Sequence, residues 1–362
     1  RVRGCRLVGR RAKSEVPFGA GGHGVHATGA AGFVLVDCEV EGGRGSDVTI
    51  YGPFITDGGP GGDGVHAVDS RAVLLGGTFK GGAGGLGYDY AGCGGDGSQV
   101  TGHGLFASGG AFTGGKGGDF PNCNGTGEGG HGVNVVGPEI AELLDVTLVG
   151  GAAGIGSCGW PGKPVMGASV TYPGARRTLV GGRIASGGIA VPFTAGGVAG
   201  ERLFLLGAPR PGFAIMGHLA GAWLVPLPFF GGALPIGVIP ASGSLAATLR
   251  MPEPAAARAA APHFFQGLFV ARGAGTPAAT LSELWTATVL DRDGGPDCNG
   301  NGVSDWVDLL EGASQDLDQD LLPDECVPHG GRHWFVDPAA PVLGNGSPQL
   351  PFRTIRRAMD AA

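Results

Sequence analysis

Two features are missing from this chain of 362 residues: a long glycine-free amphipathic stretch and an excess of positive charge. Glycine costs about 1 kcal/mol at each interior position of a helix, so the first absence excludes a helical bundle. The formal net charge of −7 lacks the basic footprint of nucleic-acid-binding proteins. We therefore expect no nucleic-acid partner.

Charged residues are also absent from the segment 211–249, yet this segment does not predict a membrane span. Pro226, Pro228, Pro235 and Pro240 interrupt it, and proline removes a backbone donor that a helix exposed to lipid needs. We expect buried or edge strands here and no membrane span.

Glycine and proline are abundant instead, with 77 Gly and 26 Pro in the chain. Such content is typical of disordered or collagen-like chains, but 42% of the residues are hydrophobic, which argues against disorder. Glycine does not recur at every third residue, which excludes collagen. The class that remains is an all-β protein with many tight turns.

A Gly-Gly-x-Gly motif recurs four times in the first half of the chain and ends at Gly24, Gly64, Gly97 and Gly132. Each copy is followed by a second anchor after 14, 13, 13 and 14 residues. The second anchors are Cys38, Gly77, Gly110 and Val146. The strand-bearing segment is therefore constant, whereas the loop that follows it varies in length, as in a solenoid whose insertions lie on one side.

Each constant segment holds three short strands, for example an apolar run at 33–36 and a third strand at 38–40. This pattern resembles the coils of right-handed parallel β-helices of the pectate-lyase-like kind. The resemblance covers 1–194 and implies about six coils, about 29 Å of stack at the spacing of paired strands, with glycine at corners of positive φ. It requires Val25, Val65 and Val133 to lie above one another.

Stacking of the coils predicts two polar columns on one face. They consist of His23, Asp63, Asp96 and His131, and of His26, His66, Gln99 and Asn134. Because β-helix lyases and hydrolases carry carboxylates and basic groups on such a face, the resemblance implies a groove for an extended extracellular polysaccharide. Asp63 and Asp96 are the paired carboxylates that hydrolysis needs and are the catalytic candidates. The alternative is that these are solvated turn residues, which stack because every coil stacks.

The seven cysteines suggest an oxidising compartment. Cys5 and Cys38 occupy the same place on successive coils, so their Cα atoms should lie about 5 Å apart, within reach of a disulfide. A reduced, inward-facing pair is the alternative. Cys93, Cys123 and Cys158 fall in successive variable loops, where two of them could pair.

The glycine repeat fades beyond the solenoid, and segment 195–292 alternates short apolar strands with proline turns. Examples of the strands are 203–206, 245–249, 266–270 and 285–290. This alternation predicts a small β-sandwich.

An acidic segment at 293–328 carries two loops with the spacing of a calcium-binding loop. The first would bind calcium through oxygen atoms of Asp297, Asn299, Asn301, Val303 (its carbonyl), Asp305 and Asp308. The second would use Asp316, Asp318, Asp320, Leu322 (its carbonyl) and Asp324. It departs from the pattern because Leu321 replaces the turn glycine and Val327 stands where the last carboxylate belongs.

The two loops resemble dockerin and thrombospondin type 3 calcium repeats. This resemblance implies a secreted protein with calcium as its cofactor, and a disulfide between the flanking Cys298 and Cys326 would close the unit. A disordered acidic linker is the alternative, but carboxylates and amides at alternate positions argue against it. A run at 309–310 predicts a short helix between the loops.

The last segment, 329–362, resembles the opening of a parallel β-helix: a strand at 334–337, a polar glycine loop and a Thr-started amphipathic helix that caps the stack. We therefore expect further domains of the same parent chain, including a second β-helix.

Together these patterns predict a secreted or cell-surface modular scaffold that is non-catalytic and contacts glycans. One alternative is a polysaccharide lyase or glycoside hydrolase that acts on the β-helix face. The other is a dockerin-like module that recruits a partner.

Overall fold

The computed structural model describes the chain except for residues 1, 14–18, 48–49, 52–53, 56, 88–89, 121–126, 157–158, 173, 216–218, 227–231, 255–259, 272–278, 317–321, 327–333, 342, 348 and 362. The fold is all-β, as the sequence predicts. Two compact units are present. Unit 1 comprises Arg1–Val180, Thr194–Ala247 and Phe264–Trp285, and unit 2 comprises Gly181–Phe193, Thr248–His263 and Thr286–Ala362. The four predicted domain ranges stay a prediction.

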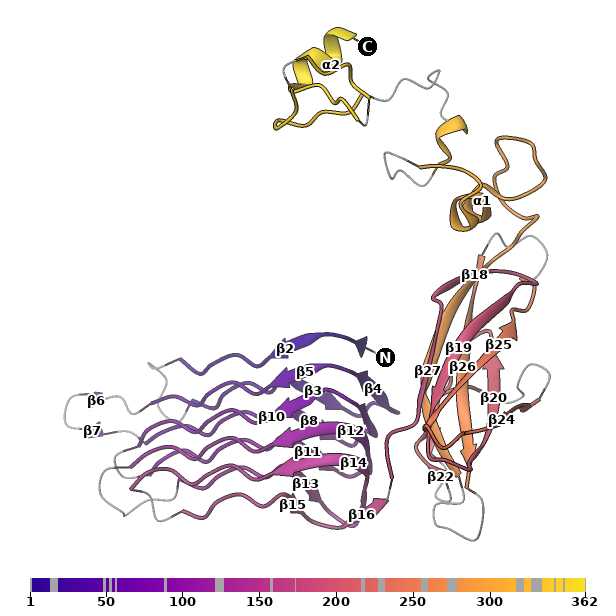
Figure 1. The fold of residues 1–362 in the computed structure, drawn as a ribbon. Helices are drawn as coiled ribbons and strands as arrows, with labels where there is room; N and C mark the ends of the chain where they lie inside the picture. Colours follow the sequence, from indigo (N-terminus) through magenta and orange to yellow (C-terminus); the bar gives the residue numbers. More distant parts are fainter. Residues whose placement is uncertain are drawn as a thin grey trace. The chain divides into compact units, whose positions relative to one another are not determined.

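The N-terminal part of unit 1 is a β-solenoid of about four turns (Figure 1). One of its faces is a parallel sheet of β3 (Val25–Thr28), β8 (Val65–Val68), β11 (Ser98–Thr101), β13 (Val133–Val136) and β15 (Val165–Met166). Val25 pairs with Val65, and Ser98 pairs with both Val65 and Val133. The predicted stacking of the three valines is therefore confirmed.

The other two faces belong to one nine-stranded sheet. The second face contains β1 (Val2–Arg3), β4 (Phe33–Val36), β9 (Ala72–Leu75) and β16 (Ser169–Tyr172), and the third contains β2 (Arg6–Val8), β5 (Glu39–Glu41) and β10 (Thr78–Lys80). The long strands β12 (Leu105–Thr113) and β14 (Ala141–Val149) run through both faces and join them. The constant segment thus folds as three successive strand positions.

The corner between the second and third faces is formed by residues with positive φ. Gly4, Asp37, Gly76, Gly109 and Asp145 adopt φ values of 59°, 51°, 67°, 57° and 53°. Glycine was expected at such corners, and aspartate takes two of the places because its short polar side chain tolerates the left-handed region.

Side chains that point inward from all three faces form the core of the solenoid. Leu35, Leu74, Leu105 and Leu143 are at most 3% exposed. The rings of Phe79 and Phe112 stack with centroids 4.8 Å apart. Stacking of like residues on successive coils thus buries an apolar ladder. It runs through the part of each coil that consists of strands, which we call the strand half.

The segments that the sequence analysis reads as variable loops are extended arms that pair with one another. We call 9–12, 19–24, 42–46, 57–64, 81–87, 91–97, 114–120, 127–132, 150–156 and 159–163 the glycine arms. A relay of backbone hydrogen bonds crosses them: Gly43 N–H to Gly22 O, Gly62 to Gly43, Gly82 to Gly62, Gly95 to Gly82, Gly115 to Gly95, Gly130 to Gly115, Gly151 to Gly130 and Gly162 to Gly151, at 2.7–2.9 Å. Figure 1 draws the arms as wavy, roughly parallel traces that continue from the strands.

The glycine arms pack so closely that side chains do not fit between them. A Cβ atom on Gly62, Gly82, Gly95 or Gly115 would overlap a backbone carbonyl of the adjacent arm. Gly-Gly-x triplets such as 81–83, 84–86, 114–116 and 117–119 place glycine on the packed sides of each arm, as in extended chains with three residues per turn. A hairpin of β6 (Ile50–Tyr51) and β7 (Phe54–Ile55) extends one pair of arms.

Downstream of the solenoid the strands form two larger sheets. The first has the order β17 (Thr178–Gly181), β19 (Ala190–Gly196), β25 (Ser244–Arg250). The second has the order β18 (Ile184–Ser186), β27 (Ala279–Leu290), β26 (Ala260–Val270), β20 (Arg202–Ala208), β24 (Leu234–Val238), with β22 (Leu219–Ala220) also on β27. The strands β21 (Ala214–Ile215) and β23 (Ala222–Trp223) pair with each other.

Unit 2 carries the helical elements of the described chain: α1 (Asp305–Glu311), the 3₁₀ turn η1 (Asp324–Cys326) and α2 (Ile355–Ala361). The short helix expected near 309–310 is α1, and it ends at Gly312 with φ 75°. Before α2, Val336 forms a parallel bridge with Phe352, and Thr354 Oγ1 accepts a hydrogen bond from Arg357 N–H at 3.3 Å. No helix among the described residues is long and apolar enough to cross a membrane.

Candidate functional site

The first polar column forms a chain of hydrogen bonds from coil to coil. Each side chain accepts the backbone N–H of the next member: His23 Nδ1 from Asp63 at 3.0 Å, Asp63 Oδ1 from Asp96 at 2.7 Å, Asp96 Oδ1 from His131 at 2.6 Å, and His131 Nδ1 from Lys163 at 2.9 Å. The predicted alignment of the column is confirmed. Asp63 and Asp96 thus each join their own coil to the next one through a side-chain hydrogen bond, which we call a staple.

The two carboxyl groups of this column differ in their pKa. Burial acts to raise the pKa of Asp63, but hydrogen bonds with His23, the Asp96 N–H and His66 together bring it below its ordinary value. The pKa of Asp96 is raised, chiefly by burial and also by the nearby charge of Asp63, against hydrogen bonds from Asn134 and the His131 N–H. Asp63 is therefore the more strongly ionised of the two.

The second polar column is also aligned as the sequence predicts. His26 pairs in register with His66, and Gln99 pairs with both His66 and Asn134. Asn134 Nδ2 donates to Asp96 Oδ2 at 2.7 Å, and His66 Nδ1 lies 2.7 Å from Asp63 Oδ2. The two columns are thus joined to each other through both carboxylates.

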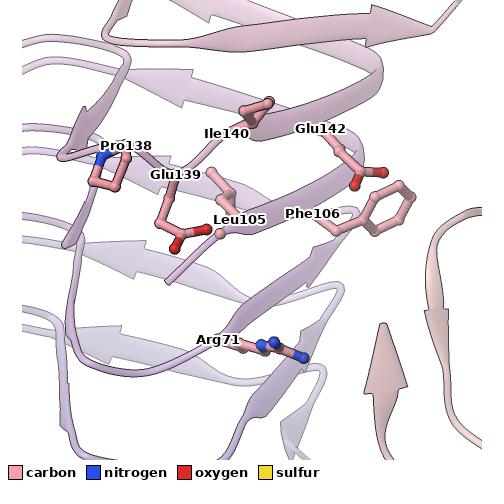
Figure 2. A pocket seen from close by; sticks show the side chains of 8 residues that line it. Arg71, Leu105, Phe106, Pro138, Glu139, Ile140 and Glu142 are labelled. Carbon is pink, nitrogen blue, oxygen red and sulfur yellow. The ribbon is translucent and has the colours of Figure 1, made fainter. Parts of the chain in front are cut away.

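A pocket that the sequence analysis missed lies on the solenoid beside β12 and β14. Its volume is about 270 Å³, and Figure 2 shows Arg71, Glu139 and Glu142 around it with Leu105, Phe106, Pro138 and Ile140. Burial raises the pKa of Glu142, although a hydrogen bond from the Tyr172 hydroxyl at 3.3 Å opposes the rise. One feature of the sequence points to this pocket. Glu142 is a charged residue between two apolar residues of β14, Ala141 and Leu143, which are buried.

A second, open groove of about 440 Å³ follows the bases of the glycine arms, and it too was missed. Arg11, Arg44, Lys80 and Lys116 line it together with Glu41. Lys80 Nζ lies 3.0 Å from Glu41 Oε1. Arg44 and Lys116 each lie 2.5 Å from an aspartate three residues onward, Asp47 and Asp119. The groove therefore carries paired charges, with Lys80 and Glu41 at the ends of β10 and β5 and with Arg44 and Lys116 at the x positions of glycine triplets.

The first predicted calcium loop folds back on itself around the carboxylate of Asp308. Asn299 Nδ2 and Asn301 Nδ2 donate to Asp308 Oδ2 at 3.1 and 2.8 Å. Asp297 Oδ2 accepts the Gly302 N–H at 2.9 Å, and Gly302 has a φ of 80°, as the sharp turn of such a loop requires. The structure thus brings four of the predicted ligands together.

Of the two remaining predicted ligands, Val303 lies two residues before α1 and Asp305 is the first residue of α1. Asp305 is 1% exposed, and its Oδ1 accepts the Cys298 N–H at 2.9 Å. The position it occupies in a calcium loop often contacts the ion through water. Val303 donates its N–H to Asn301 Oδ1 at 2.7 Å. The donors are carboxylate, amide and carbonyl oxygens, which suit calcium.

A disulfide joins Cys298 to Cys326, with Cα atoms 5.5 Å apart, as the sequence analysis expects. It connects the first loop to the end of the second. Of the second predicted loop, the structure describes Asp316, Leu322 and Asp324, and the Asp324 N–H donates to the Gln315 carbonyl at 2.8 Å. Asp318 and Asp320 lie outside the described residues.

Cys5 and Cys38 lie on adjacent coils, with their sulfur atoms 2.7 Å apart, as free thiols. Burial, followed by the interaction with Cys38, raises the pKa of Cys5 to about 11. Cys93 is an exposed free cysteine, and Cys123 and Cys158 lie outside the described residues.

The chain was compared with protein-family models, with curated proteins and with solved structures, and none of the three comparisons gives a match. The function of this protein is therefore inferred from the geometry above. Its features are coils joined by side-chain hydrogen bonds, two surface pockets lined in part by charged residues, and an acidic loop in unit 2 that a disulfide closes.

Proposed function

We propose that this protein is a secreted or cell-surface structural scaffold without catalytic activity. The observation that carries the proposal is the first polar column, in which each side chain accepts the N–H of the following coil. Oδ1 of Asp63 and Oδ1 of Asp96 each take part in a hydrogen bond that joins one coil to the next, so both carboxylates serve the stacking of the coils. A long stack fixed in this way suits a rigid spacer or matrix element.

The scaffold has three further parts in this proposal. The two larger sheets downstream of the solenoid form a β-sandwich, and 293–328 is a calcium-stabilised spacer. The segment 334–361 opens a second solenoid of the parent chain. Calcium would be held by the predicted ligands Asp297, Asn299, Asn301, Val303, Asp305 and Asp308. Rotating each asparagine amide by half a turn presents oxygen in place of the nitrogen that now faces Asp308. Dockerin-like recruitment stays the weaker alternative because α1 is only seven residues long.

The open groove along the glycine arms is where we propose that the scaffold contacts an extracellular polysaccharide. Its charges are paired, for example Lys80 with Glu41, so the groove offers donors and acceptors without a strong net field. Hydroxyl-rich sugars satisfy such groups, and an extended chain fits a groove that crosses several coils.

Calcium titration tests the spacer. Calcium at about 100 times its Kd should stabilise the folded loop by about 2.7 kcal/mol and raise its unfolding temperature. Asp308→Asn should lose this shift, whereas Asp293→Asn, which changes an exposed acidic residue just before the loop, should keep it. An unfolding temperature that calcium leaves unchanged in the native chain contradicts the calcium-stabilised spacer.

A polysaccharide lyase or glycoside hydrolase is the second candidate function. For such an enzyme, the pocket of Figure 2 is a better candidate active site than the pair of Asp63 and Asp96. A carboxyl group with a raised pKa, such as Glu142, is suited to donate a proton to a leaving group. Incubation with a panel of glycans, followed by assays for reducing and unsaturated ends, separates the two functions. Cleavage that disappears in Glu142→Gln, Asp63→Asn or Asp96→Asn would contradict the scaffold.

A further inference from the structure

We propose that His23, Asp63 and His66 form a binding site for a divalent transition metal, with zinc as the ion that best suits the donors. The three side chains each offer a ligand atom, and these atoms lie within 4.8 Å of one another. His23 and Asp63 hold equivalent positions on two successive coils, and His66 follows in β8. This site is separate from the calcium loop and does not depend on the proposed scaffold function.

The carboxylate of Asp63 is fixed in the orientation that a metal ligand needs. Its Oδ1 accepts the Asp96 N–H at 2.7 Å, so its Oδ2 is held toward the two imidazoles. Asp63 Oδ2 lies 2.7 Å from His66 Nδ1 and 3.3 Å from His23 Nδ1. Ligands about 2.1 Å from a tetrahedral zinc ion lie about 3.4 Å from one another. The 3.3 Å separation from His23 is close to this value, and the 2.7 Å separation from His66 widens by about 0.7 Å when the ion replaces the hydrogen bond.

Both imidazoles can reach solvent, whereas the carboxylate is buried. The side chains of His23 and His66 are 30% and 21% exposed, and that of Asp63 is 10% exposed. The His23 and His66 rings stack with centroids 4.2 Å apart and planes 19° apart, so one ring turns about its Cβ–Cγ bond when both Nδ1 lone pairs bind the same ion. An ion can therefore enter from solvent, with water available as a further ligand.

The next coil provides a comparison within the same molecule. Asp96 makes the same staple, to the His131 N–H at 2.6 Å, but its Oδ2 accepts from the amide of Asn134 at 2.7 Å. Stapling thus needs only the carboxylate and one hydrogen-bond donor. The two histidines on Asp63 exceed this structural need, and two imidazoles with one carboxylate form a donor set typical of transition-metal sites.

The donor set also selects the ion. Calcium and magnesium prefer oxygen ligands, so two imidazole nitrogens disfavour them and favour zinc. Zinc takes the place of the proton between His66 Nδ1 and Asp63 Oδ2, and that proton moves to His66 Nε2, which leaves the ring neutral. It also competes with the Asp63 N–H for the lone pair of His23 Nδ1. Coordination therefore replaces two hydrogen bonds.

Calorimetric titration of the full chain with zinc, in saturating calcium, tests the site. Loss of an outer partner of a metal ligand already costs about 10- to 100-fold in affinity, so His66→Asn, which removes a ligand but keeps a hydrogen-bond donor, should weaken zinc binding at least about 100-fold. His131→Asn alters the same kind of column residue two coils away and should leave zinc affinity unchanged. Cobalt should give visible absorption bands without the thiolate charge-transfer band that binding at the cysteines would produce.

Diethylpyrocarbonate labelling of the native chain supplies a readout that needs no variant. Zinc should protect His23 and His66 from modification and leave His131 reactive, whereas calcium alone should protect none of the three. Absence of zinc binding, equal zinc affinity in His66→Asn, or unprotected His23 and His66 at saturating zinc would each overturn the proposal. The calcium-dependent unfolding shift stays unaffected by any of these outcomes, so the two ideas fail separately.

Discussion

Each solenoid coil has a strand half and a glycine half, the latter made of the glycine arms, and the two halves are stabilised by different interactions. In the strand half, inward side chains such as Leu74 and Phe112 form apolar ladders. In the glycine half, backbones pack directly on backbones, and hydrogen bonds such as Gly95 N–H to Gly82 O join the arms. The first half gains stability from buried apolar surface, and the second gains it from close contact and satisfied backbone groups.

The difference predicts opposite tolerance to substitution. An apolar ladder accepts other side chains of similar volume at a modest cost. A backbone-packed arm accepts no side chain at its packed glycine positions, because the space that a Cβ would need there is already filled by a neighbouring carbonyl. Glycine is thus the core residue of one half and the corner residue of the other.

The largest effect should come from alanine in a glycine arm. The Cβ of Gly95→Ala would overlap the backbone of Gly62, so we expect a loss of more than about 4 kcal/mol in the free energy of unfolding, or failure to fold. The matched control is Gly182→Ala, whose Cβ would lie 3.5 Å from Val191 Cγ1 in ordinary contact. Guanidinium unfolding measures both. Equal stability of the two variants would contradict close packing of the arms.

Cavity formation in the strand half should come next. Phe112→Ala removes a ring that is 1% exposed and stacked on Phe79, and should cost about 3–5 kcal/mol. Val149→Ala, at a position 47% exposed on the same face, should change little. A loss for Phe112→Ala below about 1 kcal/mol would mean that the strand half lacks a tightly packed core.

A smaller effect is expected at the border between the halves, where the first polar column lies. Asp96→Ala leaves the His131 N–H without its acceptor and should cost about 1–3 kcal/mol, whereas Asp96→Asn keeps an oxygen there and should cost less. Thermal unfolding distinguishes the two. If Asp96→Asn is as unstable as Asp96→Ala, the charge of Asp96 contributes more to stability than its hydrogen bond to the His131 N–H.

The smallest effect should follow pH at Glu142, on the outer surface of the strand half. Because burial raises its folded-state pKa above the ordinary 4.5, its favourable contribution is present below that value and is lost as pH rises through the folded pKa. Glu142→Gln should therefore raise the unfolding temperature slightly at pH 7 and leave it unchanged near pH 4. A gain that is larger at acid pH would have the wrong sign.

The strand half could be predicted from the sequence because equal spacing between anchors fixes register. The stacking of Val25 on Val65 followed from the repeat alone, and so did the alignment of His26 with His66. The number of coils, about six, stays a prediction, and the structure shows a solenoid of about four turns. Short strand pairs near the ends of a stack are weakly specified by an apolar pattern of two or three residues.

The glycine half was misread as loops because its signal has a different period. Glycine triplets such as 114–116 and 117–119 are local, and a test for a three-residue period over the whole chain rejects them. Variation in arm length hid them further, since a longer arm can extend outward without disturbing the stack. The relay of hydrogen bonds between arms joins residues 11–21 positions apart, and it leaves no mark in a single sequence beyond this triplet.

The positions of the column residues could be predicted from the sequence, but their contacts could not. Residue type suggested that Asp63 and Asp96 act as catalytic carboxylates, yet only coordinates reveal that each accepts a backbone N–H from the next coil. The pocket at Glu142 depends on which face of β14 points outward and on what surrounds it, which the strand pattern does not specify. The disulfide between Cys298 and Cys326 was accessible to sequence because both residues flank one acidic unit.

The central claim is that the glycine arms are an ordered, hydrogen-bonded half of the solenoid. Hydrogen–deuterium exchange of the backbone amides of Gly62, Gly82, Gly95, Gly115 and Gly130 tests it most directly. The account predicts protection comparable to that of the amides of β8 and β11, because both sets open only when the stack does. Exchange of these glycine amides at the rate of an unstructured chain, beside protected strands, would contradict it.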